Sequence, residues 1–213
     1  MAVVKADAYG LGAVDISKYL NSININTFAV ATLEEAILLR KNGVKGDILI
    51  LGYTYPENFW LLKKYNLIQS IVDYNYALLL AEYEGEFRTH IKVDTGMNRM
   101  GIPYNRKEDL LNIFNLKNLC VEGVFTHLCV ADSRREDDVN YSLMQIDRFD
   151  QVIDYLHMHG NYPYIHINSS YGYLNGYHCR TNENFTRIGI AMYGVNDSKS
   201  MLKNLHFELT PVF

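Results

Sequence analysis

Residues 27–51 read TFAVATLEEAILLRKNGVKGDILIL. Two apolar runs, Phe28–Ala31 and Ile48–Leu51, flank a segment with the marks of a helix. Thr32 can cap its start, acidic residues fill the first turn, basic residues fill the last, and Gly43 can end it in a left-handed conformation. Both runs are continuously apolar, as in strands that are covered on both faces. The stretch therefore predicts a strand, helix and strand of a parallel sheet.

The same alternation extends along the whole chain, with no repeat or Pro-rich linker to divide it. Eight segments read as strands: Ala2–Ala8, Thr27–Thr32, Asp47–Tyr53, Ile68–Asp73, Arg88–Asp94, Cys120–Leu128, Tyr164–Ser169 and Phe185–Tyr193. The longest predicted helix runs from Val139 to about His159, with an apolar stripe of Leu143, Ile146, Phe149, Val152, Ile153 and Leu156. Residues 171–184 predict a loop or a short helix.

Eight such units favour an α/β fold of the (β/α)8 TIM-barrel type, although alternation alone also permits an open doubly wound sheet. The length of 213 residues is slightly below the roughly 250 that are usual for such barrels. Polar groups gather where the predicted strands end, from Lys5 after the first to Asn168 and Ser169 after the seventh. A closed barrel brings these ends together, whereas an open sheet separates the first strand from the fifth. The sequence therefore favours closure.

Composition excludes several classes of function. The net charge of −4 gives no basic surface for nucleic acid, and no apolar stretch approaches the roughly 18 residues of a membrane span. Nothing after Met1 resembles a secretory signal, so we expect a cytoplasmic protein. Cys120, Cys129 and Cys179 are odd in number and lack metal-finger spacing, which predicts thiols with neither a disulfide framework nor a metal site.

Lys5 interrupts the first apolar run and is followed by the small Ala6. A lysine at a strand end commonly extends to water, but in a half-buried pocket its amine becomes a nucleophile or a base. Four further blocks of sequence also contain polar or ionisable side chains that could take part in chemistry. The five blocks are AVVKADAYGLG at 2–12, HIKVDTGMNRMG at 90–101, GVFTHL at 123–128, INS at 167–169 and RIGIAMYG at 187–194.

These blocks, in this order, resemble the motifs of the alanine racemase family, and the resemblance covers the chain from Ala2 to about Phe213. The stretch SSYG at 169–172 is also similar to the serine/alanine racemases of vancomycin-resistance clusters. The resemblance implies a barrel that binds pyridoxal 5'-phosphate through Lys5 as an internal aldimine. It implies a racemase that interconverts the L and D forms of alanine or serine by exchange of the α-proton.

The resemblance also assigns roles to individual residues. Tyr9, Ser169 and the amides near Gly189 and Ile190 would bind the phosphate, which agrees with the phosphate site that barrels place after strands seven and eight. Arg187 would bond to the pyridine nitrogen and Arg99 would face the phenolic oxygen. Lys92 resembles a family position that can be carbamylated and so orient that arginine, and Asp94 is a supporting residue. His127 would lie against the ring and support Arg187, and Asn168 would be a scaffold neighbour of the cofactor.

The resemblance breaks at both ends. The family begins with a helix before the lysine strand and continues into a C-terminal β-domain, and the family's tyrosine for the opposite face of the substrate comes from that domain across a homodimer interface. We expect residues 1–205 to form the barrel and residues 206–213 to begin a truncated β-domain. Within the motifs, Asn98 stands where the family usually has glycine, a change that asparagine tolerates if φ is positive there. Binding of the cofactor without racemase turnover, or an inert fragment, stays open as an alternative.

Overall fold

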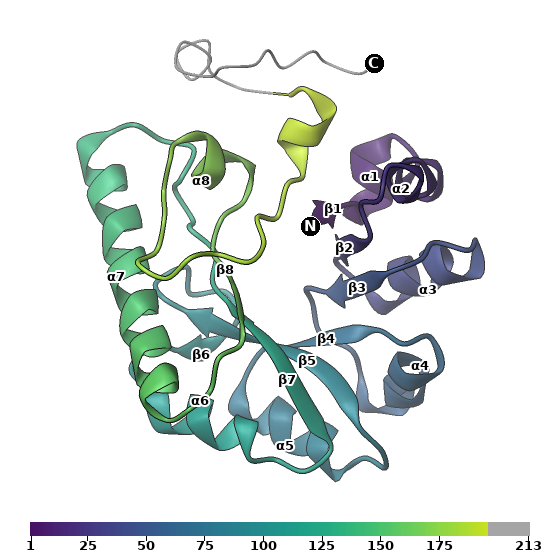
Figure 1. Ribbon diagram of the computed structural model, residues 1–213, viewed down its shortest axis with the longest axis horizontal. Coiled ribbons are helices and arrows are strands. Elements are labelled where there is room, and N and C mark those ends of the chain that lie inside the picture. The colour runs from purple at the N-terminus through teal and green to yellow at the C-terminus, as the bar shows by residue number, and fades with distance from the viewer. Residues whose placement is uncertain (196–213) are drawn as a thin grey trace.

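The computed structural model describes residues 1–195, which form parallel strands alternating with helices (Figure 1). The strands are β1 (Ala2–Val3), β2 (Thr27–Val30), β3 (Asp47–Ile50), β4 (Ile68–Ile71), β5 (Phe87–Asp94), β6 (Ile102–Pro103), β7 (Leu119–Phe125) and β8 (Tyr164–His166). The helices are α1 (Lys5–Gly10), α2 (Ala13–Ser22), α3 (Leu33–Lys41), α4 (Phe59–Lys64), α5 (Tyr74–Glu82), α6 (Lys107–Phe114), α7 (Glu136–Met158) and α8 (Ser170–Leu174), with 3-10 turns η1 (Pro56–Asn58) and η2 (Ile190–Tyr193). The predicted start of a second domain at 206–213 lies outside the described residues.

The main sheet has the order β1-β2-β3-β4-β5-β7-β8, and all its ladders are parallel. The short β6 pairs with β5 and was not predicted. A segment without regular strand structure joins the two ends of the sheet through isolated parallel bridges, Ser169 with Arg187 and Ala2 with Ile188. The Val3 amide donates to the Ile188 carbonyl at 2.8 Å. The sheet therefore closes into the predicted barrel, and the open alternative is wrong.

The last predicted strand, Phe185–Tyr193, needs correction because only its first half is extended. Gly189 has φ −117° and ψ −96°, which turns the chain out of the sheet direction, and η2 follows immediately. The bridges at Arg187 and Ile188 thus close the barrel without a regular ladder. The turn brings backbone amides of η2 to the carboxyl end of the barrel, beside Tyr9.

The first predicted strand, Ala2–Ala8, is also wrong after Val3. The four residues Ala6–Tyr9 all have positive φ, between 51° and 59°, and form a left-handed turn within α1. A left-handed conformation costs L-residues roughly 1–2 kcal/mol each, so this turn persists only because its surroundings hold it. Asp7 Oδ1 accepts the Ala13 amide at 2.8 Å, which ties the turn to α2.

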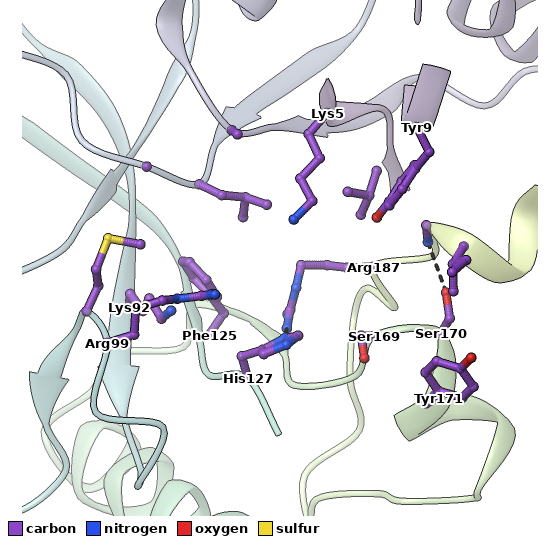
Figure 2. A pocket seen from close by; sticks show the side chains of 17 residues that line it. Lys5, Tyr9, Lys92, Arg99, Phe125, His127, Ser169, Ser170, Tyr171 and Arg187 are labelled. Carbon is purple, nitrogen blue, oxygen red and sulfur yellow. Dashed lines mark hydrogen bonds between the residues drawn. The ribbon is translucent and has the colours of Figure 1, made fainter. Parts of the chain in front are cut away.

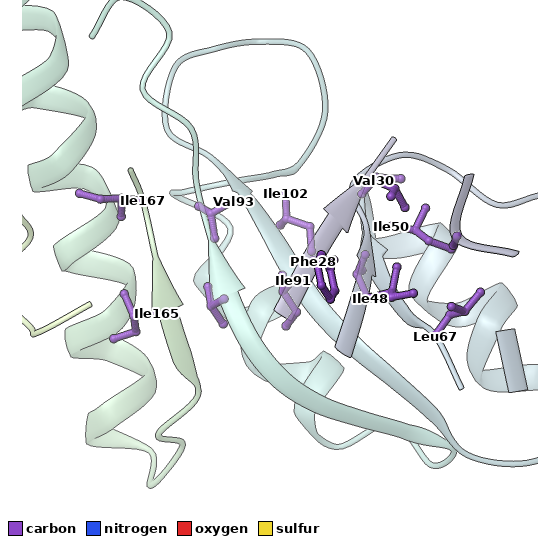
Figure 3. Close-up of a cluster of buried hydrophobic side chains, with 14 of the residues drawn as sticks. Phe28, Val30, Ile48, Ile50, Leu67, Ile91, Val93, Ile102, Ile165 and Ile167 are labelled. Carbon is purple, nitrogen blue, oxygen red and sulfur yellow. The ribbon is translucent and has the colours of Figure 1, made fainter. Parts of the chain in front are cut away.

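Apolar side chains cover both faces of the sheet, as the continuous apolar runs predict. Phe28 and Val30 belong to the cluster between the strands and the helices (Figure 3), whereas Ala29 packs inside the barrel with Leu49. The residues that alternate along one strand therefore face opposite sides. The helices α2 to α7 lie around the outside of this curved sheet (Figure 1).

The two helices with the clearest sequence signals form where predicted. Thr32 and Glu35 make a reciprocal capping box at the start of α3, and Gly43 has φ +83° just beyond its end. Helix α7 begins slightly earlier than predicted, and Leu143 is wrongly placed on its apolar stripe because 51% of it is exposed. Residues 170–174 form the short helix α8 in the predicted loop region.

The cysteines are three partly buried free thiols, which confirms the prediction against a disulfide framework. Within the described part of the chain, no helix has both the length and the apolar character that crossing a bilayer requires.

Candidate functional site

A cavity of about 400 Å³ lies at the carboxyl ends of the barrel strands. Four cationic side chains line it (Figure 2), and none of its described lining residues is a carboxylate. The structure therefore brings most of the predicted site into one place that attracts an anion. The predicted residues that line the cavity are Lys5, Tyr9, Lys92, Arg99, His127, Ser169, Arg187, Gly189 and Ile190.

The left-handed turn of α1 places Lys5 and Tyr9 at its two ends, and both side chains reach the cavity (Figure 2). The Lys5 amine points into the open space. Burial raises the pKa of the Tyr9 phenol, which keeps it protonated and able to donate a hydrogen bond at neutral pH. An amine and a phenol thus face the same cavity from one rigid turn.

Gly189 forms part of the cavity wall opposite Tyr9. A side chain at position 189 would collide with the Tyr9 hydroxyl, so only glycine leaves this part of the cavity open. The adjacent Ser170 hydroxyl accepts the amides of Gly189 at 3.1 Å and Ala191 at 3.2 Å. Ser170 was not among the predicted site residues, although it directly follows Ser169 and lines the same cavity.

The Arg187 guanidinium is buried and fixed by backbone and side-chain acceptors. Nη1 donates to His166 Nδ1 at 2.8 Å and to the His166 carbonyl at 2.9 Å, and Nη2 donates to the carbonyls of Thr126 at 2.7 Å and Ile167 at 2.9 Å. It also lies 5.3 Å from the centre of the Phe125 ring. These bonds leave Nε–H as the donor without a partner among residues 1–195. Burial lowers the pKa of Arg187 to about 10, so the side chain stays charged at neutral pH.

Two buried histidines, not singled out from the sequence, continue the network from Arg187. An arginine only donates, so His166 Nδ1 must accept and its Nε2 must carry the proton. His166 Nε2 lies 2.9 Å from His90 Nδ1, which is then an acceptor. A side chain at Gly123 would approach the His90 ring to 2.6 Å, so this glycine provides the space for it. The chemistry of one arginine thus sets the tautomers of both rings.

His127 lies on the other side of Arg187, with Nδ1 at 3.5 Å from Arg187 Nη2. Burial and then the nearby charge of Arg187 lower the pKa of His127 to about 3, so the ring is neutral. Since Nδ1 faces a donor, Nε2 carries the proton. His127 therefore lies beside Arg187 as a neutral ring near neutral pH, and its predicted role toward Arg187 stays a prediction.

Lys92 and Arg99 line the remaining wall. Burial and then the charge of Arg99 lower the pKa of Lys92 to about 8. Asp94 lies outside the cavity lining and instead holds the loop that carries Arg99, because its Oδ1 accepts the amides of Gly96 at 2.9 Å and Asn98 at 3.1 Å. Asn98 has φ +55°, so asparagine does occupy a left-handed position in this loop.

Asn168 is buried behind the cavity wall rather than within it. Its Nδ2 donates to the Tyr177 carbonyl at 2.6 Å and to Glu183 Oε1 at 2.8 Å. The placement fits a scaffold residue that fixes the chain before Ser169, and it offers no direct contact with a molecule in the cavity.

Comparison with known proteins settles the ancestry of this barrel. Residues 1–197 match the family described as alanine racemase, N-terminal domain. The chain belongs to the alanine racemase family. An amino-acid racemase of Enterococcus faecalis is 41% identical over 213 residues, which are 100% of this chain and 30% of that protein. A serine/alanine racemase of Enterococcus gallinarum is 41% identical over 195 residues, which cover 91% of this chain and 28% of that protein.

The fold agrees with the same family. A solved structure of alanine racemase from Clostridium difficile 630 in complex with cycloserine superimposes with a TM-score of 0.89 at 31% identity, covering 99% of this chain and 58% of that one. The family and the barrel predicted from the five sequence blocks are therefore confirmed. The chain spans under a third of the two curated relatives and a little over half of the solved one.

Gln145 does not line the cavity but supports the segments around it, and the family motifs do not indicate this residue. Its Nε2 donates to Thr95 Oγ1 and to the His127 carbonyl, each at 3.2 Å, and its Oε1 accepts the Cys129 amide at 3.1 Å. This fully buried amide thus ties the loop after β5 to the segment after β7. A polar residue among the buried positions of α7 was the signal in the sequence.

Proposed function

We propose that this chain is the pyridoxal 5'-phosphate-binding barrel of an amino-acid racemase that acts on alanine or serine. The observation that carries the proposal is the cavity itself, with four cationic side chains, no carboxylate among its described lining residues and a wall at Gly189 that a side chain would close. A phosphorylated, negatively charged ring fits this set of donors. When bound, the cofactor supplies an aldehyde for an amine and a conjugated ring that stabilises negative charge at the substrate α-carbon.

Each end of such a cofactor has suitable partners in the cavity. Lys5 holds the aldehyde end because its amine points into the open space. The phosphate end is assigned to the wall formed by Tyr9, Ser169, Gly189 and Ile190. The phenol, the Ser169 hydroxyl and the Ile190 amide are the donors there, whereas Gly189 supplies space because its own amide is bound to Ser170. Arg99 is assigned to the phenolic oxygen, with Lys92 beside it.

Arg187 is assigned to the ring nitrogen through its Nε–H, the donor that its other bonds leave available. An arginine does not give up its proton in practice, so it binds this nitrogen without protonating it. The position of the guanidinium is fixed by four acceptors and by the neutral His127. A ring nitrogen that is bound but not protonated favours return of the proton to the α-carbon over its transfer elsewhere on the cofactor.

Racemisation requires proton transfer on both faces of the α-carbon. Lys5 takes or returns the proton on one face, since its amine is the basic group that points into the cavity. The family resemblance assigns the other face to a tyrosine of a second copy in a homodimer. We therefore propose a small amino-acid substrate and a dimeric active form.

The test of this function is the absorbance of the purified chain mixed with pyridoxal 5'-phosphate. We expect a protein-bound band in the wild type and its loss in Lys5→Ala, because the Lys5 amine is the one assigned to the aldehyde end of the cofactor. Lys18→Ala on the exposed face of α2 is the matched control and keeps the band. Borohydride reduction followed by mass spectrometry should locate the cofactor on Lys5.

Activity is followed as the loss of optical activity of L-alanine and L-serine. No band in the wild type would refute cofactor binding altogether. A band without racemisation would favour the alternative, a chain that binds the cofactor without turnover.

Gly189→Ala tests the phosphate end of the site. The added methyl group collides with the Tyr9 hydroxyl, so we expect the cofactor affinity to fall at least roughly tenfold and the fold to lose about 1–3 kcal/mol of stability. The double variant with Tyr9→Phe removes the colliding oxygen. It should recover stability in urea unfolding but not affinity, because the phenol donor is lost as well. Recovery of both would contradict the role assigned to Tyr9.

A further inference from the structure

The left-handed turn Ala6–Tyr9 is an unusual support for a reactive lysine. Four consecutive residues with side chains have positive φ, although right-handed or extended conformations are open to all of them. Lys5 directly precedes this turn and Tyr9 ends it, and both side chains line the cavity. Whatever fixes the turn therefore fixes both side chains.

Glu35 makes a contact that reaches this turn from helix α3. Its Oε1 accepts the Ala6 amide at 2.7 Å, across 29 residues of sequence. Its Oε2 accepts the Ala31 amide at 2.7 Å and the Thr32 amide at 3.3 Å. One carboxylate thus caps its own helix with one oxygen and holds the peptide group that directly follows Lys5 with the other.

We propose that Glu35 is a positioning residue for Lys5. The inference rests on the proposed function, in which Lys5 binds the cofactor. The Ala6 amide belongs to the peptide bond between Lys5 and Ala6. Its hydrogen bond to Glu35 Oε1 therefore fixes the orientation of this peptide plane, and with it the direction of the Lys5 side chain. Glu35 is not among the residues that line the large cavity, and it acts only through this backbone contact.

Glu35→Gln tests the proposal with little change of shape. An amide has one accepting oxygen and one NH₂ group, so it cannot accept both the Ala6 and the Ala31 amide. The readout is the ratio of two affinities, for pyridoxal 5'-phosphate and for pyridoxine 5'-phosphate, whose alcohol cannot condense with the lysine. We expect this preference for the aldehyde to fall roughly tenfold, because a charge-assisted hydrogen bond that holds the lysine is lost.

Thr32→Ala is the matched control. It removes the other half of the same capping box, in which Thr32 Oγ1 accepts the Glu35 amide at 3.4 Å, and leaves the bond to Ala6 in place. Its preference for the aldehyde should stay within about twofold of the wild type, although the helix is weakened. An equal ratio in Glu35→Gln and wild type would overturn the proposal and leave Glu35 with the helix cap alone.

A second measurement is independent of the cofactor. Amide hydrogen exchange in the peptide that contains Ala6–Tyr9 should be faster in Glu35→Gln than in Thr32→Ala, and equal rates would overturn the proposal even if the wild type showed no cofactor band. If Glu35→Gln does not fold, Glu35→Asp, which keeps the charge but is one methylene shorter, is compared with Thr32→Ala by the same two readouts and criteria.

Discussion

Arg187→Ala is expected to cost at least about 3 kcal/mol of unfolding free energy, in addition to any loss of cofactor binding. The reason is the number of buried acceptors that lose their donor together. The two Nη atoms donate hydrogen bonds to four buried acceptors, which are the carbonyls of Thr126, His166 and Ile167 and the Nδ1 atom of His166. A buried acceptor without a partner costs about 1–3 kcal/mol, and water entering the space recovers part of that cost.

Urea unfolding without added cofactor measures this effect. Arg180→Ala is the control, because it removes another arginine that has partners but lies at the surface. The Arg180 side chain pairs with Asp150 at 3.3 Å and Asp154 at 3.1 Å, and 62% of it is exposed. Its loss should cost clearly less than that of Arg187, because ion pairs of an exposed side chain contribute little to stability. If the two variants were equally stable, Arg187 would not hold the ends of the strands together as its contacts indicate.

The fold could be predicted because its signals are local. In residues 27–51 the apolar runs, the Thr32 cap and Gly43 each indicate the same strand, helix and strand, and the structure confirms all three. Agreement of this kind between propensity, capping and patterning is what makes a segment predictable.

Prediction failed where distant contacts override local preference. Nothing in AVVKADAYG indicates four left-handed residues, because the contacts that stabilise them come partly from Glu35 on another helix. The segment after Phe185 reads as a strand, but Gly189 turns it into η2 before a ladder can form. Both deviations from the local rule lie at the cavity, and at Ala6–Tyr9 the strained backbone presents the Tyr9 side chain to it.

The residues of the candidate site also fall into two groups, those that a local motif indicates and those whose roles depend on distant contacts. Lys5, Tyr9, Arg99, His127 and Arg187 could be predicted because each lies in one of the five short blocks that resemble the family's motifs, and all five line the cavity. The roles of His166 and His90 depend on bonds that span 21 and 76 residues, so no local pattern contains them.

Acid is expected to destabilise the barrel between pH 7 and pH 5 because three histidines are buried in neutral form. Burial lowers the pKa of His90 to about 4 and that of His127 to about 3, and it holds the pKa of His166 well below its ordinary value of 6.5. In the unfolded chain all three rings take up protons as the pH falls through about 6.5, whereas in the folded chain they do not. Their stabilising contribution is therefore complete above pH 6.5 and is lost as the pH falls toward 4.

The size of the effect follows from the number of protons. Each histidine that is protonated only in the unfolded chain lowers stability by about 1.4 kcal/mol per pH unit, or about 2 kcal/mol between pH 7 and pH 5. The pKa values of Asp150 and Glu183 are raised by burial, so these carboxyl groups act in the opposite direction, but from ordinary values of 3.8 and 4.5 and thus toward the lower end of this range.

Urea unfolding at half-unit steps from pH 7 to pH 5 measures the slope. His90→Gln should reduce it by about one proton, since the glutamine oxygen can still accept from His166 but does not titrate. Comparing slopes rather than absolute stabilities removes the cost of repacking the amide beside Gly123. His159→Gln, the same exchange at an exposed position after α7, is the control. An unchanged slope in His90→Gln would mean that His90 takes up its proton equally in the folded and unfolded chains, which the buried, donor-facing geometry of its ring does not permit.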